Sequence, residues 1–129
     1  MKKLLRWGWV VLWMAVIFLA SADADSGDRS GGILRFLLTL TGLDLEPESF
    51  AHLQWVARKG AHMTAYAILY GLSWRASGER SRSLGICLVY AISDEWHQSF
   101  VSGRVGTPWD VLIDMLGAGL ASLVIGRMR

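Results

Sequence analysis

The apolar residues of the chain collect in four blocks, and the charged residues lie almost entirely between these blocks. Each block, extended by its flanks, reaches the roughly 20 residues that a helix needs to cross a bilayer core about 30 Å thick. A soluble helical bundle would place polar residues along the outward stripe of every helix. In the first block Trp7, Trp9 and Trp13 with their apolar neighbours surround the whole helix. The sequence therefore predicts an all-α membrane protein with four transmembrane helices, near residues 4–21, 53–75, 83–101 and 108–126.

The composition agrees with this prediction and excludes several other classes. Of the 129 residues 53% are apolar and 19% are charged, against roughly 45–50% and about 25% in soluble domains. This balance excludes intrinsic disorder, and a single cysteine, Cys87, excludes a disulfide scaffold. Thirteen basic and eleven acidic residues give a net charge of +2. Without a clustered basic face we expect no nucleic-acid partner. The length fits one domain, residues 1–129.

The charges between the blocks predict the orientation of the chain. Basic residues dominate at 2–6, 75–82 and 127–129, whereas the segment 21–55 carries six acidic residues and two arginines. Because basic flanks stay on the cytoplasmic side, both termini are predicted to be cytoplasmic and the long first loop to face outward.

The N-terminal half contains a long outer loop and an apolar block with a basic start. In the first outer loop Gly27, Gly31 and Gly32 are expected to mark a flexible part, followed by a short helix at 33–40 that lies in the membrane interface, since eight residues are too few to span. The first block, with its basic start and the sequence Ala-Ser-Ala at 20–22, also fits a cleavable signal peptide.

Ionisable and polar side chains lie inside three of the predicted spans, where a charge costs about 2.5–3.5 kcal/mol at the bilayer centre. They therefore need partners, water or a function. At 100° per residue they form one stripe on each helix. The stripes consist of Lys59, His62 and Tyr66 in the second span, Asp94, Glu95, His97 and Gln98 in the third, and Asp110 and Asp114 in the fourth.

The three stripes are predicted to meet at one level, in the outer third of the membrane. At 1.5 Å per residue Asp94 lies about 10 Å below the outer end of its span, and Asp114 lies about 10 Å below the start of the next. Arg104 follows in the short outer loop above them. Gly117 continues the face of Asp114 and allows another helix to approach closely. An outward-facing polar pocket is therefore expected between the helices.

These segments resemble the VanZ-like family of small bacterial membrane proteins. The resemblance extends over residues 7–126 and rests on WVVLWMAVIFLAS at 9–21, RKGAHMTAY at 58–66, AISDEWHQSFVSGR at 91–104 and WDVLIDMLGAGL at 109–120. The family pattern maps onto Lys59, His62, Tyr66, Asp94, Glu95, His97, Gln98, Arg104, Asp110 and Asp114, which we expect to be the ligand-binding residues. Ser102 stands where the family often has proline, a departure that concerns the stiffness of the loop.

The resemblance also carries expectations about place and role. It implies a multi-pass protein of the bacterial plasma (inner) membrane whose first helix is retained rather than cleaved. The family's namesake is linked to glycopeptide resistance, specifically low-level tolerance of teicoplanin. This implies a role at the cell envelope.

Structural interpretations compete with a functional one at each polar group. Thr107, Pro108 and Asp110 are typical of a helix start, so Asp110 can be a simple cap. The group Asp94, Glu95, His97 and Gln98 can be an interhelical clasp that fixes packing with Lys59 and Arg104. These residues include metal-ligand types, but paired-histidine spacing is missing, so no metal and no cofactor are expected.

Three functional classes follow from these residues. In the first, Arg58, Lys59 and Arg104 bind the phosphate of a lipid headgroup, a phospholipid or a polyprenyl-linked envelope precursor. Asp94, Glu95, His97 and His62 are then the candidate acid–base residues, and both a binding and a catalytic role stay open. In the second, the polar cluster is a non-catalytic clasp. The third, a proton-relay transporter, is disfavoured because the polar stripes do not continue inward.

Overall fold

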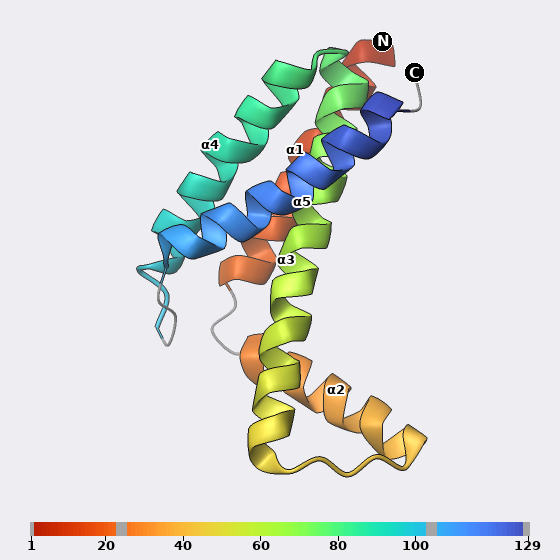
Figure 1. Cartoon of the computed structure of the whole chain (residues 1–129). Coiled ribbons are helices and arrows are strands. Elements are labelled where there is room, and N and C mark those ends of the chain that lie inside the picture. Colours follow the sequence, from red (N-terminus) through yellow and green to blue (C-terminus); the bar gives the residue numbers. More distant parts are fainter. Residues whose placement is uncertain (1, 23–25, 103–105, 128–129) are drawn as a thin grey trace.

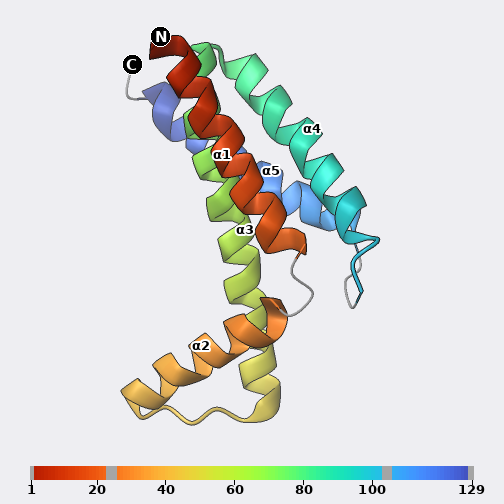
Figure 2. The same cartoon turned by 180° about the vertical axis from the view of Figure 1, so that it is seen from behind.

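The computed structural model describes residues 2–22, 26–102 and 106–127, which form five α-helices and no strand. The helices are α1 (Lys2–Ala22), α2 (Ser26–Thr41), α3 (Pro47–Ser77), α4 (Arg80–Gln98) and α5 (Pro108–Arg127). Helices α1, α4 and α5 form a bundle with α3, and α3 contacts every other helix (Figure 1). Helix α2 lies across the first part of α3, away from α4 and α5 (Figure 2). The predicted all-α fold is confirmed.

The helices alternate in direction. The start of α1, the α3–α4 turn and the end of α5 all lie at one end of the bundle (Figure 1). The turn is tight because Gly78 adopts a left-handed conformation (φ 73°) and its N–H binds the Trp74 carbonyl at 2.7 Å. Because the helices alternate in this way, α3 and α5 run in the same direction, opposite to α1 and α4 (Figure 1). The common end is the one whose flanking basic residues predict a cytoplasmic location.

Two helices of the described residues are long and apolar enough to cross a membrane, Lys3–Ala22 and Pro108–Arg127. Large apolar side chains on both face outward, with Val11 64% and Leu116 59% exposed. Of the four predicted transmembrane helices, these two are therefore the ones whose length and hydropathy alone are sufficient to cross a membrane. Helices α3 and α4 carry most of the polar side chains, and their location in the membrane stays a prediction.

The prediction of a short helix at 33–40 behind a flexible stretch is wrong. The glycine-containing stretch predicted to be flexible is part of α2, which begins at Ser26 rather than at residue 33. Gly31 lies where α2 meets α3, and a Cβ there would be 2.8 Å from the Gln54 amide nitrogen. Arg35 also lies over the Phe50 ring, 4.6 Å from its centroid. Tertiary contacts thus stabilise a helix that glycines disfavour.

The α3 and α4 boundaries differ as well. Helix α3 begins at Pro47, six residues before the predicted start, with proline in its first turn and the acidic Glu48 behind it. Helix α4 ends at Gln98, and the N–H of Ser99 binds the Glu95 carbonyl at 3.2 Å. The chain therefore turns back directly after the polar group of α4.

Small residues and tyrosines fill the centre of the bundle. Tyr66, Leu69, Cys87, Ala91 and Ala118 are completely buried. Small side chains at such positions let helices approach closely, which is how membrane helices pack. Cys87 is a buried filler of this kind.

Candidate functional site

Two ionic contacts join α3 to α5. The Lys59 ammonium pairs with the Asp110 carboxylate. Three residues further along α3, the His62 Nδ1 lies 3.2 Å from the Asp114 Oδ1. Because the two helices run in the same direction, residues about one turn apart on α3 meet residues one turn apart on α5.

The close approach of α3 and α5 depends on a glycine. A Cβ on Gly117 would overlap the backbone of Met63, next to His62. The expectation that Gly117 lets another helix approach is therefore confirmed, and α3 is that helix. This contact sets the distance across which His62 reaches Asp114.

The acidic side chains of the polar group on α4 face the interior of the bundle. Asp94, Glu95 and Gln98 are buried, with exposed fractions of 2%, 6% and 5%, whereas Trp96 on the opposite face is 70% exposed. Asp94 Oδ2 accepts hydrogen bonds from the Ser21 hydroxyl at 2.9 Å and from the Gln98 amide at 3.3 Å. Ser21, the end of α1, thus belongs to the site. In the sequence this serine belongs to the Ala-Ser-Ala motif at 20–22 and to the segment that resembles the family's first helix, and neither indicates a contact with Asp94.

Glu95 connects the end of α4 to the start of α5. Its Oε2 accepts a hydrogen bond from the Thr107 N–H at 3.0 Å. Gly106 lies so close to α4 that a Cβ would overlap the Glu95 carbonyl oxygen. Arg104, which the sequence places above the site, lies outside the described residues.

Asp110 lies at the helix start that the sequence suggested, and it also pairs with α3. Its N–H binds the Thr107 hydroxyl oxygen at 3.3 Å, and that hydroxyl lies 3.2 Å from its own Oδ2. The helix-start interpretation is therefore confirmed. The same carboxylate is also the partner of Lys59.

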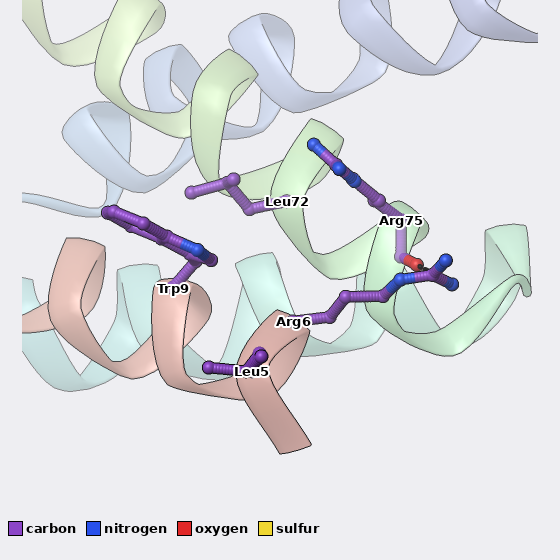
Figure 3. A pocket seen from close by; sticks show the side chains of 5 residues that line it. All are labelled: Leu5, Arg6, Trp9, Leu72 and Arg75. Carbon is purple, nitrogen blue, oxygen red and sulfur yellow. Dashed lines mark hydrogen bonds between the residues drawn. The ribbon is translucent and has the colours of Figure 1, made fainter. Parts of the chain in front are cut away.

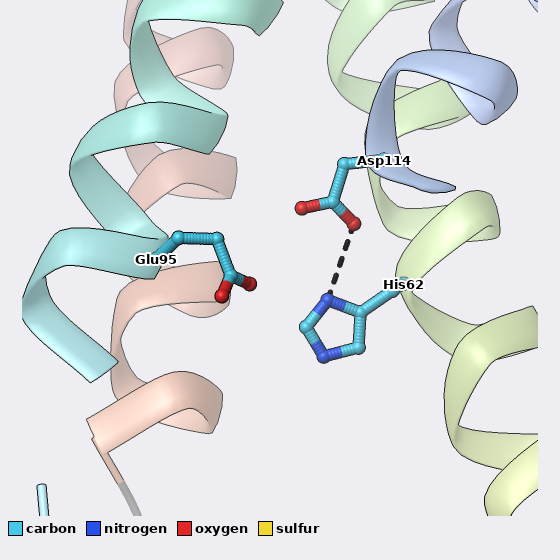
Figure 4. A group of neighbouring side chains, drawn as sticks. All are labelled: His62, Glu95 and Asp114. Carbon is cyan, nitrogen blue, oxygen red and sulfur yellow. Dashed lines mark hydrogen bonds and ion pairs between the residues drawn. The ribbon is translucent and has the colours of Figure 1, made fainter. Parts of the chain in front are cut away.

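Three side chains from three helices converge on one small volume. Figure 4 shows Glu95 of α4 pointing toward His62 of α3 and Asp114 of α5. One ligand-type atom from each of the three lies within 4.8 Å of the others. Asp94 Oδ1, Glu95 Oε1, Asp114 Oδ2 and the Tyr66 hydroxyl are buried without a hydrogen-bond partner among the described residues.

His97, the other candidate acid–base histidine, lies elsewhere. Its ring packs against Phe18 of α1, with 4.4 Å between the ring centroids. It is half-buried and outside the group of His62, Glu95 and Asp114. The structure thus brings together His62, Asp94, Glu95 and Asp114 from the predicted set. His97 is outside the group of His62, Glu95 and Asp114 but within electrostatic range of Asp94.

A cavity of about 340 Å³ lies beside the converging side chains, between α1, α2 and α3. Its walls are largely apolar, and His62, Tyr66 and Ser21 form the part nearest the buried acids. Arg58 lines it and forms no ion pair with a described residue. The remaining lining residues are Trp13, Val16, Ile17, Ala20, Ser30, Ala61 and Ala65.

A second cavity, of about 310 Å³, lies at the other end of the bundle (Figure 3). Leu5, Trp9 and Leu72 line it together with two arginines, Arg6 and Arg75. The Arg6 guanidinium donates to the Arg75 carbonyl at 3.4 Å. The described residues that line it include no acidic residue and no histidine.

A family model described as VanZ/LLP1 matches residues 7–129, nearly the whole chain. Neither the curated proteins nor the solved structures contain a match to the chain.

Proposed function

The chain belongs to the VanZ/LLP1 family, and we propose that it binds the phosphate-bearing headgroup of a cell-envelope lipid or lipid-linked precursor. We further propose that α1, α3, α4 and α5 all span the bacterial plasma membrane, with both termini in the cytoplasm. The site of His62, Glu95 and Asp114 then faces outward. Family membership supports a membrane protein, and the family's namesake is linked to glycopeptide resistance. A headgroup ligand fits both.

The observation that carries this proposal is the cavity between α1, α2 and α3. A lipid that enters from the bilayer needs apolar walls for its chain and polar groups for its head. Val16 and Ile17 supply such a wall on α1, and Arg58 and His62 supply the polar end on α3. The Trp13 indole N–H binds the Ala65 carbonyl at 2.9 Å and holds the two helices together along the wall.

Arg58 is the cation best placed to bind a phosphate. A guanidinium presents several donors in a plane and can bind two phosphate oxygens at once. The neighbouring Lys59 instead has its ammonium against Asp110. We therefore assign the headgroup contact to Arg58, with Lys59 positioning the start of α5.

Helix α2 supports a location of the cavity at the outer membrane surface. Its apolar side chains Ile33, Phe36 and Leu40 are more than 60% exposed. Such a face is typical of a helix that lies in the membrane interface. Ser30 on the same helix lines the cavity, so α2 would cover the headgroup from outside.

The structural clasp remains the second candidate function, because polar contacts link all four bundle helices. Ser21 binds Asp94, Glu95 binds Thr107, and His62 binds Asp114. Arg58 takes no part in these contacts. The clasp alone therefore predicts that Arg58→Gln has no effect, whereas the headgroup proposal predicts a loss of lipid binding.

Lipid-dependent thermal stabilisation tests the proposal. A ligand that binds the folded state raises the unfolding temperature, so a polyprenyl phosphate or phosphatidylglycerol added to delipidated protein in detergent should raise it. Arg58→Gln should remove most of this increase. Arg80→Gln, an exposed arginine at the other end of the bundle, should behave as the wild type. No increase in the wild type, or an equal increase in Arg58→Gln, would contradict the proposal.

A further inference from the structure

Charge balance in the centre of the site is incomplete. Asp94, Glu95 and Asp114 are 2%, 6% and 0% exposed. Among the described residues His62 forms an ion pair with one of them, Asp114, while Lys59 is engaged with Asp110. Ionised carboxylates that leave water need a counter-charge, and buried charges in proteins are paired or coordinate a metal. One imidazole supplies at most one positive charge for three acids.

The geometry of His62, Glu95 and Asp114 suits a single cation. Ligands about 2.0–2.2 Å from a tetrahedral ion lie about 3.3–3.6 Å from one another. The separation of 3.2 Å between His62 Nδ1 and Asp114 Oδ1 is close to the lower end of this range. All three ligand-type atoms lie within 4.8 Å, and Glu95 has a flexible side chain that can close the remaining distance. The free oxygens of Glu95 and Asp114 lack a hydrogen-bond partner among the described residues.

Tyr66 gives an independent indication of a ligand. Its side chain is fully buried one turn after His62, and no described residue accepts from or donates to its hydroxyl. Asp94, Glu95 and Asp114 all lie within electrostatic range of this hydroxyl. A buried phenol without a partner is costly, and a water or other oxygen ligand on an ion at this site would provide one.

We propose that His62, Glu95 and Asp114 bind one divalent transition-metal ion, of which Zn²⁺ is the best match. One imidazole nitrogen and two carboxylate oxygens are ligands that zinc takes, whereas Ca²⁺ and Mg²⁺ favour oxygen alone. Three protein ligands leave a further position open for a water or another oxygen ligand. Paired-histidine spacing on one helix does not reveal this site, because its ligands come from three helices. The proposal does not rest on lipid binding.

Zinc titration of the full-length protein, stripped of metal with a chelator in detergent, tests the proposal. We expect one Zn²⁺ per chain by calorimetry and by elemental analysis after desalting. Asp114→Asn and Glu95→Gln should each weaken Zn²⁺ binding at least about 100-fold. Removing a side chain that only holds a metal ligand in place costs up to about 100-fold in affinity, and these variants remove a ligand itself. His52→Gln and Glu48→Gln, exposed positions on α3, are the matched controls and should bind as the wild type.

A measurement on the wild type alone keeps the proposal testable if the ligand variants do not fold. Co²⁺ in a four- or five-coordinate protein site absorbs visible light far more strongly than hydrated Co²⁺. We expect this absorption at one equivalent and its loss when Zn²⁺ is added. A wild type without stoichiometric Zn²⁺, a spectrum of hydrated Co²⁺, or control variants that lose zinc as the ligand variants do would overturn the proposal.

Discussion

Two aspartates one turn apart on α5 have different surroundings. Asp110 donates its N–H to the Thr107 hydroxyl, which caps the helix, and its carboxylate pairs with Lys59; its side chain is 17% exposed. Asp114 is fully buried, with one oxygen near His62 and the other without a partner among the described residues. The contacts of Asp110 account for its presence by structure alone. Those of Asp114 do not, and this residue is therefore the centre of the candidate site.

At the residue scale, Ser21→Ala tests whether α1 belongs to the site. The substitution removes the donor to Asp94 and leaves a buried carboxylate oxygen less satisfied. We expect the free energy of unfolding to fall by roughly 1–3 kcal/mol, measured by denaturation in detergent. Ser93→Ala is the control, since Ser93 is exposed and binds only the Tyr90 carbonyl of its own helix. Equal effects of the two substitutions would show that the Ser21 contact contributes nothing.

Asp94→Asn separates function from the clasp. The variant keeps the size of the side chain and removes its ionisable group. If the site binds or processes an envelope lipid, the protein should reach normal levels in the membrane while teicoplanin tolerance of the producing cells is lost. Glu79→Gln, an exposed acid at the other end of the bundle, should leave both unchanged. A collapse of membrane levels in the Asp94 variant would instead support the clasp.

At the scale of the helices, the packing of α3 on α5 depends on Gly117. Gly117→Ala places a Cβ against the Met63 backbone, and overpacking of this kind costs typically 1–3 kcal/mol. Gly119→Ala on the same helix has nothing within 4 Å of the new Cβ and should be neutral or slightly stabilising. Thermal unfolding of both variants measures the difference. Equal unfolding temperatures would contradict the described helix contact.

Helical periodicity predicted much of the site, because it depends on residues within single helices. The inward face of α4 and the outward position of Trp96 follow from their spacing, and the structure agrees. Contacts between helices could not be predicted in this way. A lone serine at the end of α1 carries no signal that it binds Asp94, and glycines in α2 gave a false indication of flexibility.

At the scale of the whole molecule, the alternating helices place the start of α1 and the α3–α4 turn at one end. The turn after α4 lies at the opposite end of that helix. If the predicted orientation holds, a cysteine at Ser102 should react with a membrane-impermeant maleimide in intact cells. A cysteine at Ser81 should react only after permeabilisation. Cys87 is buried and should contribute little background. Labelling of Ser102→Cys only from the cytoplasmic side would contradict the outward-facing site.

Native mass spectrometry of the intact protein after gentle detergent extraction tests the headgroup proposal most directly. The cavity between α1 and α3, with Arg58 at its polar end, predicts that a phospholipid or polyprenyl phosphate stays bound. The adduct should be lost in Arg58→Gln and kept in Arg80→Gln. A wild-type preparation reproducibly free of bound phosphate-bearing lipid would contradict the account.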